Sequence, residues 1–215
     1  MAFADDRATR AYYDRRAPEY DDWWNGTGLY AGRERPGWRE ETGGIVALVE
    51  SLPPGRTLDV ACGTGFLTRH LRGAVVAVDQ SPAMTGIAAA RLPAVGQVVR
   101  ADALSLPFRR DSFTQVMTAH FYGHLPPDER VRFLGEARRV ARRLVVIDAA
   151  LRPGIEPEQW QERVLNDGSR HRVFKRYLTA EQLSGEIGGR VLFAGRWFVA
   201  AAADPASAGW APAPA

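Results

Sequence analysis

The 215-residue sequence contains a single cysteine, Cys62, and no long hydrophobic run. One cysteine cannot form an internal disulfide, and there is no CxxC pair that would suggest a zinc site. The longest apolar run, residues 197–203, has seven residues, whereas a transmembrane helix needs about 20. The N-terminal residues include acidic side chains and lack the apolar segment of a secretory signal. We therefore predict a cytoplasmic protein with no metal site and no membrane span.

Concentrated positive charge is also scarce. Lys and Arg together number 28 against 25 Asp and Glu, which gives a formal net charge of +3, and Lys175 is the only lysine. Proteins that bind nucleic acid usually carry basic stripes, so this balance argues against a nucleic-acid partner. The hydrophobic fraction of 46% is typical of a globular chain. We predict one domain over residues 1–203 and a disordered tail, 204–215, that is rich in Pro and Ala.

Short apolar runs alternate with helical patterns from residue 56 onward. This alternation is typical of βαβ units and a parallel sheet, and we expect an α/β fold. Several of the runs are continuously apolar, as in strands that helices cover on both faces. The expected strands are residues 57–61, 74–78, 95–100, 113–119 and 144–148.

The two ends of the chain depart from this alternation. The first 50 residues are polar and aromatic, and we interpret them as helical pieces that form a lid over another part of the molecule. Residues 151–177 contain Pro153, Pro157 and Gly168 and are too long for a plain connector, so we expect an insertion over a site. A helix over 179–187 is expected next. Two short runs, 191–194 and 197–203, then predict an antiparallel strand pair.

The strongest local signal is the segment LDVACGTGFL at residues 58–67, where a strand runs into a GxG turn that we expect to open a helix. Glycines let the backbone approach a ligand closely, and a helix N-terminus offers free N–H groups. Asp79 ends the second expected strand and Asp102 the third. These features all lie at the carboxyl ends of strands, the edge where open α/β sheets bind ligands.

The details of this loop distinguish between nucleotides. A dinucleotide fingerprint requires GxGxxG, but the third position here is Thr68. Asp59 lies within the strand, where a pyrophosphate would meet a negative charge. These two residues argue against a nicotinamide-dependent oxidoreductase and favour a ligand with a cationic amine. S-adenosylmethionine, which has an ammonium and a sulfonium beside its ribose and adenine, has this chemistry.

On these residues the sequence resembles the class I S-adenosylmethionine-dependent methyltransferases, in particular the small-molecule branch that includes the ubiquinone and menaquinone C-methyltransferases. The matching motifs are LDVACGTG at 58–65, VDQSPAM at 78–84, ADALSLPF at 101–108 and DSFTQVMTAHFYGHL at 111–125. The resemblance implies a Rossmann-like, seven-stranded, mostly parallel sheet with helices on both faces, a C-terminal antiparallel strand pair and an N-terminal helical lid. Residues 13–21 match the YDxxAxxYD-like segment of that lid.

The resemblance also implies where the cofactor binds. Asp59, Gly63 and Gly65 would surround its methionine portion, and Asp79 would bind its ribose. Gln80, Met84, Asp102 and Ala103 would lie at the adenine, with His120 beside the cofactor and Tyr13 reaching it from the lid. The full predicted cofactor site is Tyr13, Asp59, Gly63, Thr64, Gly65, Asp79, Gln80, Met84, Asp102, Ala103 and His120.

The expected reaction is an in-line SN2 transfer of the methyl group to a small-molecule acceptor, with S-adenosylhomocysteine as the product. Positioning alone supplies on the order of 7 to 11 kcal/mol in such reactions, so a base matters only for an acceptor that arrives protonated. His124 and His120 are the candidate bases. Tyr13, Trp24, Phe121 and Tyr122 are candidates for cation–π contact with the sulfonium or for plain core packing. His171 and Arg172 are candidates for lining the acceptor pocket or for solvated surface.

Two alternatives stay open at this point. The first is an RNA or tRNA methyltransferase, although residues 118–121, TAHF, lack the (N/D)PPY segment typical of amine methylation in nucleic acids. The arginines at positions 138, 139, 142 and 143 would then contact phosphates. The second is a protein that binds S-adenosylmethionine without catalysis. Oxygen, nitrogen and carbon acceptors are all compatible with the sequence, as is any oligomeric state.

Overall fold

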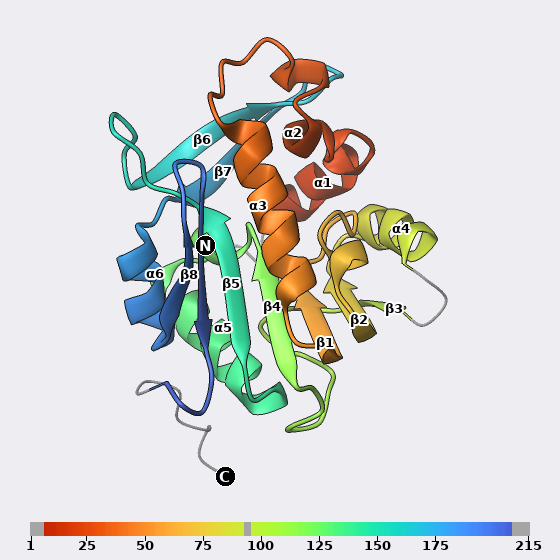
Figure 1. The fold of residues 1–215 in the computed structure, drawn as a ribbon. Coiled ribbons are helices and arrows are strands. Elements are labelled where there is room, and N and C mark those ends of the chain that lie inside the picture. Colours follow the sequence, from red (N-terminus) through yellow and green to blue (C-terminus); the bar gives the residue numbers. More distant parts are fainter. Residues whose placement is uncertain (1–6, 93–95, 208–215) are drawn as a thin grey trace.

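The computed structural model describes residues 7–92 and 96–207, and its centre is a seven-stranded sheet (Figure 1). The strand order is β3-β2-β1-β4-β5-β9-β8. Strands β1 to β5 run parallel to one another, whereas β9 is antiparallel to both β5 and β8. The predicted α/β fold with a C-terminal antiparallel pair is therefore confirmed. The strands are β1 (Gly55–Val60), β2 (Gly73–Asp79), β3 (Gln97–Arg100), β4 (Gln115–Ala119), β5 (Leu144–Ala149), β8 (Arg190–Ala194) and β9 (Phe198–Ala203).

The strand boundaries follow the predicted apolar runs, with one clear difference. The run expected over 113–119 enters the sheet only at Gln115, while Phe113 makes an isolated bridge with Ala141. The ring of Phe113 is buried under the sheet, so its apolar character reflects core packing and not strand pairing. The expected strand over 95–100 begins at Gln97, and its first residue lies outside the described residues.

Alternate residues of the strands supply two separate cores, one on each face of the sheet. One core contains helices α5 (Pro127–Val140) and α6 (Ala180–Ile187), which pack against residues such as Val146 and Ala201. The other contains helix α3 (Trp38–Ser51), which packs against Val145 and Ala200 and crosses the front of the sheet in Figure 1. Helix α4 (Pro82–Arg91) contacts β2 and β3. It begins where predicted, because Ser81 accepts a hydrogen bond from the Met84 N–H at 3.1 Å.

The helix expected directly after the GxG turn does not form. Residues 61–67 are a series of turns, and a single 3₁₀ turn, η3 (Thr68–His70), follows before β2 begins at Gly73. The connection between the two parallel strands is too short for an α-helix of ordinary length. Any backbone N–H groups that the segment directly after β1 offers at this edge therefore belong to a loop and not to a helix N-terminus.

The segment predicted as a lid divides into two structural parts. Residues 7–31 form α1 (Arg7–Arg16), η1 (Ala17–Glu19), α2 (Asp22–Asn25) and η2 (Gly28–Tyr30) at the upper end of the sheet in Figure 1. Helix α3, which the predicted lid included, is part of the core. We use "lid" below for residues 7–31 only.

The predicted insertion over 151–177 contains a regular β-hairpin that the sequence pattern did not indicate. Strands β6 (Glu158–Val164) and β7 (Arg170–Arg176) pair only with each other, in a second sheet beside α1. Alternate residues of β6 are exposed, and Gln159, Gln161 and Arg163 face inward. Among the described residues no helix has the length and apolar character of a membrane span. Of the predicted disordered tail, residues 204–207 form a turn, and the rest lies outside the described residues.

Candidate active site

A cavity lies at the carboxyl ends of β1 to β4, under the lid. Seven residues of the predicted cofactor site line it, and they come from five different segments of the chain. We call it the strand-end cavity. With α1 and Tyr20 lying across it, its volume is about 70 Å³, below the roughly 300 Å³ or more of most ligand pockets. The predicted residues on its wall are Tyr13, Gly63, Asp79, Gln80, Met84, Ala103 and His120.

Asp79 occupies the last position of β2 and organises this edge. One carboxylate oxygen accepts the Gly63 N–H at 2.9 Å and the other accepts the Ser81 N–H at 2.9 Å. Each oxygen retains a second lone pair, which can accept a hydrogen bond from a ligand hydroxyl. Burial raises the pKa of Asp79, while the hydrogen bonds from Ser81 and Gly63 oppose that rise. The residue thus joins the glycine loop to the start of α4 and offers acceptors to the cavity.

Gly63 has both a backbone conformation and a close neighbour that favour glycine. Its φ of +56° lies in the left-handed region, which other residues avoid. A Cβ atom at this position would lie 3.2 Å from Cε1 of Tyr20, a residue of the lid. A side chain at position 63 would therefore require the Tyr20 ring of the lid to shift by a few tenths of an ångström.

Four predicted cofactor residues do not line the strand-end cavity. Asp59 is buried behind the loop and accepts a 2.5 Å hydrogen bond from Thr68, the residue at the third fingerprint position. Gly65 has a φ of +77°, and a Cβ there would lie 3.4 Å from Ala88 of α4. Asp102 accepts the Leu104 N–H at 2.8 Å within its own turn. The fourth residue, Thr64, donates a hydrogen bond to the lid.

The side chain of Asp59 has an unusual environment. It lies within β1 and has no cationic partner among the described residues. Burial raises its pKa to about 7, although the hydrogen bond from Thr68 opposes this. A carboxyl group that titrates near neutrality beside a ligand cavity indicates a place where positive charge is favourable.

Polar contacts hold the lid against the sheet edge. Asp14 accepts a hydrogen bond from the Ser81 hydroxyl. Asp21 accepts from Thr64 Oγ1 at 2.6 Å and forms an ion pair with Arg91 of α4 at 2.5 Å. Within residues 13–21, sequence reasoning singled out only Tyr13 as a contact to the cofactor. The signal was present, because Asp14, Tyr20 and Asp21 belong to the same 13–21 motif, but the motif does not reveal which partner each residue has.

His120 lies immediately after β4, in the left-handed region with a φ of +55°. Its ring packs edge-on against Trp23 and Trp24, with ring centres 4.6 and 5.1 Å away. Nδ1 lies 3.9 Å from Asp148 Oδ1, and Nε2 is buried without a hydrogen-bond partner in the described structure. Burial lowers the pKa of His120 to about 3, so the imidazole is neutral at physiological pH. A neutral ring with an unpaired, buried nitrogen is suited to hydrogen-bond a ligand.

His124 is also held in one orientation. Its Nδ1 lies 2.6 Å from the carbonyl oxygen of Phe174. Because a carbonyl only accepts hydrogen bonds, Nδ1 carries the proton and the lone pair lies on Nε2. Burial moves the pKa of His124 well below its usual range, and nearby Lys175 lowers it further.

Beneath both histidines lies a buried ion pair between Asp148, the fifth residue of β5, and the only lysine. Lys175 Nζ lies 2.5 Å from Asp148 Oδ1, and Asp148 also accepts the N–H groups of Gly123 and Ala149 at 2.7 Å each. Burial raises the pKa of Asp148, but Lys175 outweighs it and the pKa is about 2. The sequence reasoning did not include this pair; the uniqueness of the lysine is the one signal that pointed to it.

A second and larger cavity lies between the lid and the β6–β7 hairpin, with a volume of about 730 Å³. We call it the hairpin cavity. Its walls are mainly aromatic and basic side chains of the lid, α3, the hairpin and Trp197. Four residues line both cavities: Tyr13, Tyr20, His120 and His124. The two cavities are therefore neighbours that meet at two tyrosines and two neutral imidazoles.

Several predicted contacts lie elsewhere. Trp24 is stacked on Phe66 in the core and lines neither cavity. Tyr122 is buried and donates a hydrogen bond to Glu186 of α6, whereas Phe121 does line the strand-end cavity. His171 packs against Tyr12, and Arg172 is exposed, so neither lines the hairpin cavity. Aromatic and basic residue types do not reveal from sequence which way they face.

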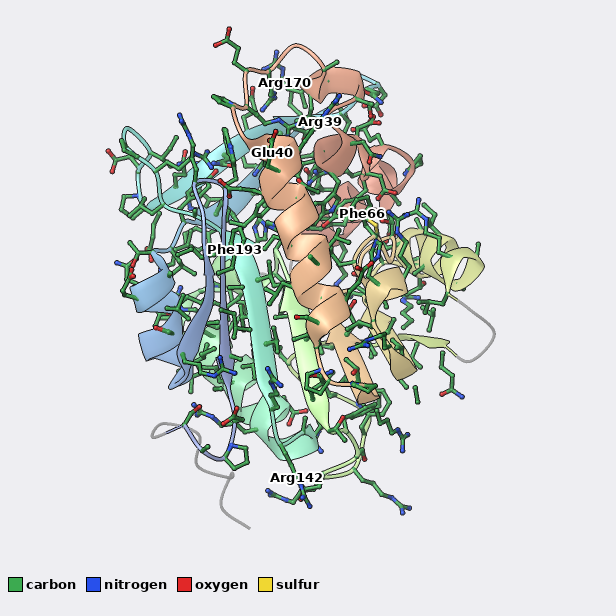
Figure 2. The ribbon with its side chains drawn as sticks, viewed as in Figure 1. Arg39, Glu40, Phe66, Arg142, Arg170 and Phe193 are labelled. Atoms are coloured by element: carbon green, nitrogen blue, oxygen red, sulfur yellow. The ribbon has the colours of Figure 1, made fainter. Side chains whose placement is uncertain are left out.

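The arginine cluster considered for phosphate contacts lies far from both cavities. Figure 2 shows Arg142 at the lower end of the sheet, whereas Arg170 marks the hairpin at the upper end. Arg139 binds Glu136 at 2.7 Å and the carbonyl oxygens of Leu106 and Phe108. The cluster therefore includes a residue that holds a loop, and it does not continue into the site.

Comparison with known proteins agrees with this geometry. A family of methyltransferase domains matches residues 58–146, the part of the chain that runs from β1 to β5. An uncharacterized methyltransferase of Alkaliphilus oremlandii is 26% identical over 60% of this chain. A demethylmenaquinone methyltransferase of Thermotoga maritima is 34% identical over 52% of this chain. The chain spans 60% and 49%, respectively, of the lengths of these two curated relatives.

Solved structures extend the comparison to the whole fold. The DhpI–SAM–HEP complex superposes with a TM-score of 0.72, covering 92% of this chain and 96% of that one at 24% identity. The similarity therefore extends well beyond the matched domain. At this level of identity it establishes a shared fold.

Proposed function

We propose that this chain, which belongs to the class I S-adenosylmethionine-dependent methyltransferases, transfers a methyl group to a small-molecule acceptor bound in the hairpin cavity. The observation that carries the proposal is the shared wall of the two cavities. A donor in the strand-end cavity and an acceptor in the hairpin cavity would meet at Tyr13, Tyr20, His120 and His124. The fold and the cofactor class come from the family, and the acceptor's place comes from this geometry.

The residues of the strand-end cavity match the chemistry of the cofactor. Asp79 offers carboxylate oxygens to ribose hydroxyls, and Gly63 allows close approach of the backbone. Met84 and Ala103 supply apolar surface for the adenine. Asp59, behind the loop, places negative charge near the cationic end of the ligand. When bound, S-adenosylmethionine supplies an activated methyl group on a sulfonium, which an acceptor can take in line.

The remaining work of the protein is to position the acceptor and exclude water. The lid covers the strand-end cavity and is held there by Asp14 and Asp21. His120 Nε2 is placed to accept a hydrogen bond from a hydroxyl or amine of the acceptor and so to fix its orientation. The small volume of the strand-end cavity means that the lid must move for a cofactor to enter. Orientation of this kind supplies on the order of 7 to 11 kcal/mol of the barrier.

Thermal unfolding with S-adenosylmethionine, S-adenosylhomocysteine or NADH tests the cofactor part of the proposal. A ligand present at 100 times its Kd stabilises the protein by about 2.7 kcal/mol, or roughly 5 to 11 °C for a chain of this size. We expect this shift with both sulfur compounds and none with NADH. A shift with NADH alone would overturn the cofactor assignment.

Turnover tests the catalytic part. Protein incubated with S-adenosylmethionine and a library of small nucleophiles should release S-adenosylhomocysteine in an acceptor-dependent way. Binding of the cofactor with no release for any acceptor, RNA included, would instead support a non-catalytic role. Release with RNA alone would transfer the proposal to nucleic-acid methylation.

A further inference from the structure

The hairpin cavity has an excess of positive charge. The only carboxylates on its wall are Glu34 and Glu162, and Glu162 is paired with Arg170 outside the cavity. The charge of Lys175 is matched by Asp148, whereas none of the five arginines on the wall forms an ion pair with a carboxylate of the described residues. The basic residues that line the cavity are Arg16, Arg33, Arg35, Arg152, Arg163 and Lys175.

Two of these arginines are available to a ligand. Arg163 is partly buried on the inward face of β6, and within the described chain no hydrogen bond or ion pair engages its guanidinium. Arg16 donates to the hydroxyl of Tyr12 at 3.0 Å and lies over the ring of Tyr20, 4.8 Å from its centre. It has no carboxylate partner in the part of the chain that the structure describes. Each guanidinium has several N–H donors, and both side chains line the cavity, so donors remain for a ligand.

The other walls are flat and aromatic. Trp23, Trp38, Trp160 and Trp197 line the cavity together with several tyrosines. The Arg152 guanidinium lies over the ring of Trp197, 4.3 Å from its centre, and so packs against the aromatic wall. Such walls favour a planar apolar body of the ligand, while guanidinium groups favour carboxylates and phosphates.

We propose that the methyl acceptor carries an anionic group, a carboxylate or a phosphate-type group, on a planar apolar body, and that Arg163 and Arg16 bind the anionic group. The inference rests on the proposed function only in identifying the occupant of the hairpin cavity as the acceptor. The two cavities would then differ in the charge of the ligand that they favour. Within the described residues, neither the Asp59 carboxyl group behind the loop of the strand-end cavity nor the Arg163 guanidinium of the hairpin cavity has an ion-pair partner.

The first test uses wild-type protein saturated with S-adenosylhomocysteine and calorimetric titration of four matched probes. These are 2-naphthoate, 2-naphthyl phosphate, 2-naphthamide and 2-naphthylmethylamine, which differ mainly in charge. We expect at least one of the two anions to bind at least 10-fold more tightly than the amide, with the amine weakest, and we expect high salt to reduce the preference. The two anions distinguish a carboxylate site from a phosphate site. Equal affinities for anion and amide, or a preference for the amine, would overturn the proposal.

Variants then locate the anion site. Arg163→Gln should weaken binding of the preferred anion by at least five-fold and leave the amide unchanged. Arg172→Gln is the matched control, since it removes the same charge from the exposed face of the same hairpin. Arg16→Gln should act like Arg163→Gln, and if it fails to fold, the wild-type probe series and Arg163→Gln still decide. An unchanged anion affinity in Arg163→Gln would contradict the assignment.

Titration of S-adenosylhomocysteine alone separates this proposal from the proposed function. If the cofactor product binds but the probes show no charge preference, only the nature of the acceptor is wrong. If the cofactor product does not bind at all, the proposed function fails, and with it the description of the hairpin cavity as an acceptor site.

Discussion

The strand-end cavity and the hairpin cavity share four residues but are built in opposite ways. Most residues of the strand-end cavity come from one stretch, 61–124, where each parallel strand ends. The hairpin cavity draws on the lid, α3, residues 149–177 and Trp197, which are far apart in the chain. Their charges also differ, since Asp79 lines the former and Arg163 the latter. The residues proposed to bind the cofactor thus come mainly from one stretch of the sequence, whereas those proposed to bind the acceptor come from distant segments.

Two buried carboxyl groups, Asp59 and Asp148, also differ, in their pKa values. Burial raises the pKa of Asp59 to about 7, because no cation accompanies it. Burial acts on Asp148 too, but Lys175 holds the pKa of that group at about 2. Asp148 is therefore neutralised within the protein, whereas the described residues give the Asp59 side chain a hydrogen bond from Thr68 but no cation. The predictions below test these two environments against each other.

The largest effect is expected from Lys175→Met, which leaves Asp148 buried without its cation. Removing one partner of a buried ion pair costs about 3 to 5 kcal/mol. At roughly 2 to 4 °C per kcal/mol for a chain of this size, the melting temperature should fall by more than 5 °C. Differential scanning calorimetry measures the loss.

A double variant provides the control for this result. Asp148→Asn combined with Lys175→Met removes both charges, and it should recover part of the lost stability because no unpaired charge remains. If Lys175→Met alone were as stable as the wild type, the ion pair between Asp148 and Lys175 would not contribute to the stability of the protein.

Asp79→Ala is expected to have the next largest effect, on the other cavity. It removes the acceptors that hold the Gly63 and Ser81 N–H groups and that we propose bind the ribose hydroxyls of the cofactor. Loss of two such hydrogen bonds should weaken binding of S-adenosylhomocysteine by about 100-fold, or roughly 2.7 kcal/mol. Isothermal titration measures this. Asp128→Asn, in the exposed first turn of α5, is the control and should bind normally. Normal binding by Asp79→Ala would mean that Asp79 serves the loop and not the ligand.

The sequence was sufficient for the sheet and for the strand-end cavity, because both depend on local patterns. Asp79 follows a buried run, and Gly63 follows another, so their meeting at the sheet edge could be inferred from strand order. The helix after the GxG turn was predicted wrongly, because the apolar residues Phe66 and Leu67 pack into the core without forming a helix. The roles predicted for Asp59 and Asp102 in binding the cofactor remain predictions, although their side chains do not line the cavity.

The hairpin cavity was not predictable in the same way. Its residues are brought together by the pairing of β6 with β7 and by the contact between α1 and β7, both of which are long-range. His171 was a candidate for its wall and lies on the same face of the hairpin as its cross-strand partner Arg163, but His171 packs against Tyr12 and Arg163 lines the cavity. Alternation along a polar strand gives no apolar signal from which orientation can be inferred.

Asp59→Asn is a smaller change that sharpens the comparison through pH. The native state retains the Asp59 proton up to about pH 7, whereas the unfolded state loses it near pH 3.8. The contribution of the raised Asp59 pKa to the free energy of unfolding of the wild type is therefore fully present below about pH 4 and is lost as the pH rises to about 7. The variant lacks this loss, so it should be more stable than the wild type at about pH 8, by at least about 1.4 kcal/mol.

Urea unfolding of both proteins across this pH range measures the difference. The stability gap between Asp59→Asn and the wild type should shrink steadily as the pH falls toward 4. The variant should also bind S-adenosylmethionine more weakly, because it has lost the negative charge. A gap that is constant with pH would show that Asp59 keeps an ordinary pKa and that the two carboxylates do not differ in the way described.

The smallest effect is expected from Arg91→Gln, which tests whether the lid couples the two cavities. Arg91 pairs with Asp21 of the lid at 2.5 Å and donates to the Thr64 carbonyl at 3.2 Å. Both partners are partly exposed, so the pair contributes about 0.2 to 1 kcal/mol, which corresponds to at most about a five-fold change in rate or affinity. Because the closed lid leaves little space in the strand-end cavity, a looser lid should let S-adenosylhomocysteine enter and leave faster, with the melting temperature nearly unchanged. Stopped-flow tryptophan fluorescence measures both rates, and Arg132→Gln on the exposed face of α5 is the control. If exchange rates stayed at the wild-type values, the lid would open by a route that does not involve this ion pair, and the two cavities would be coupled only through the residues they share.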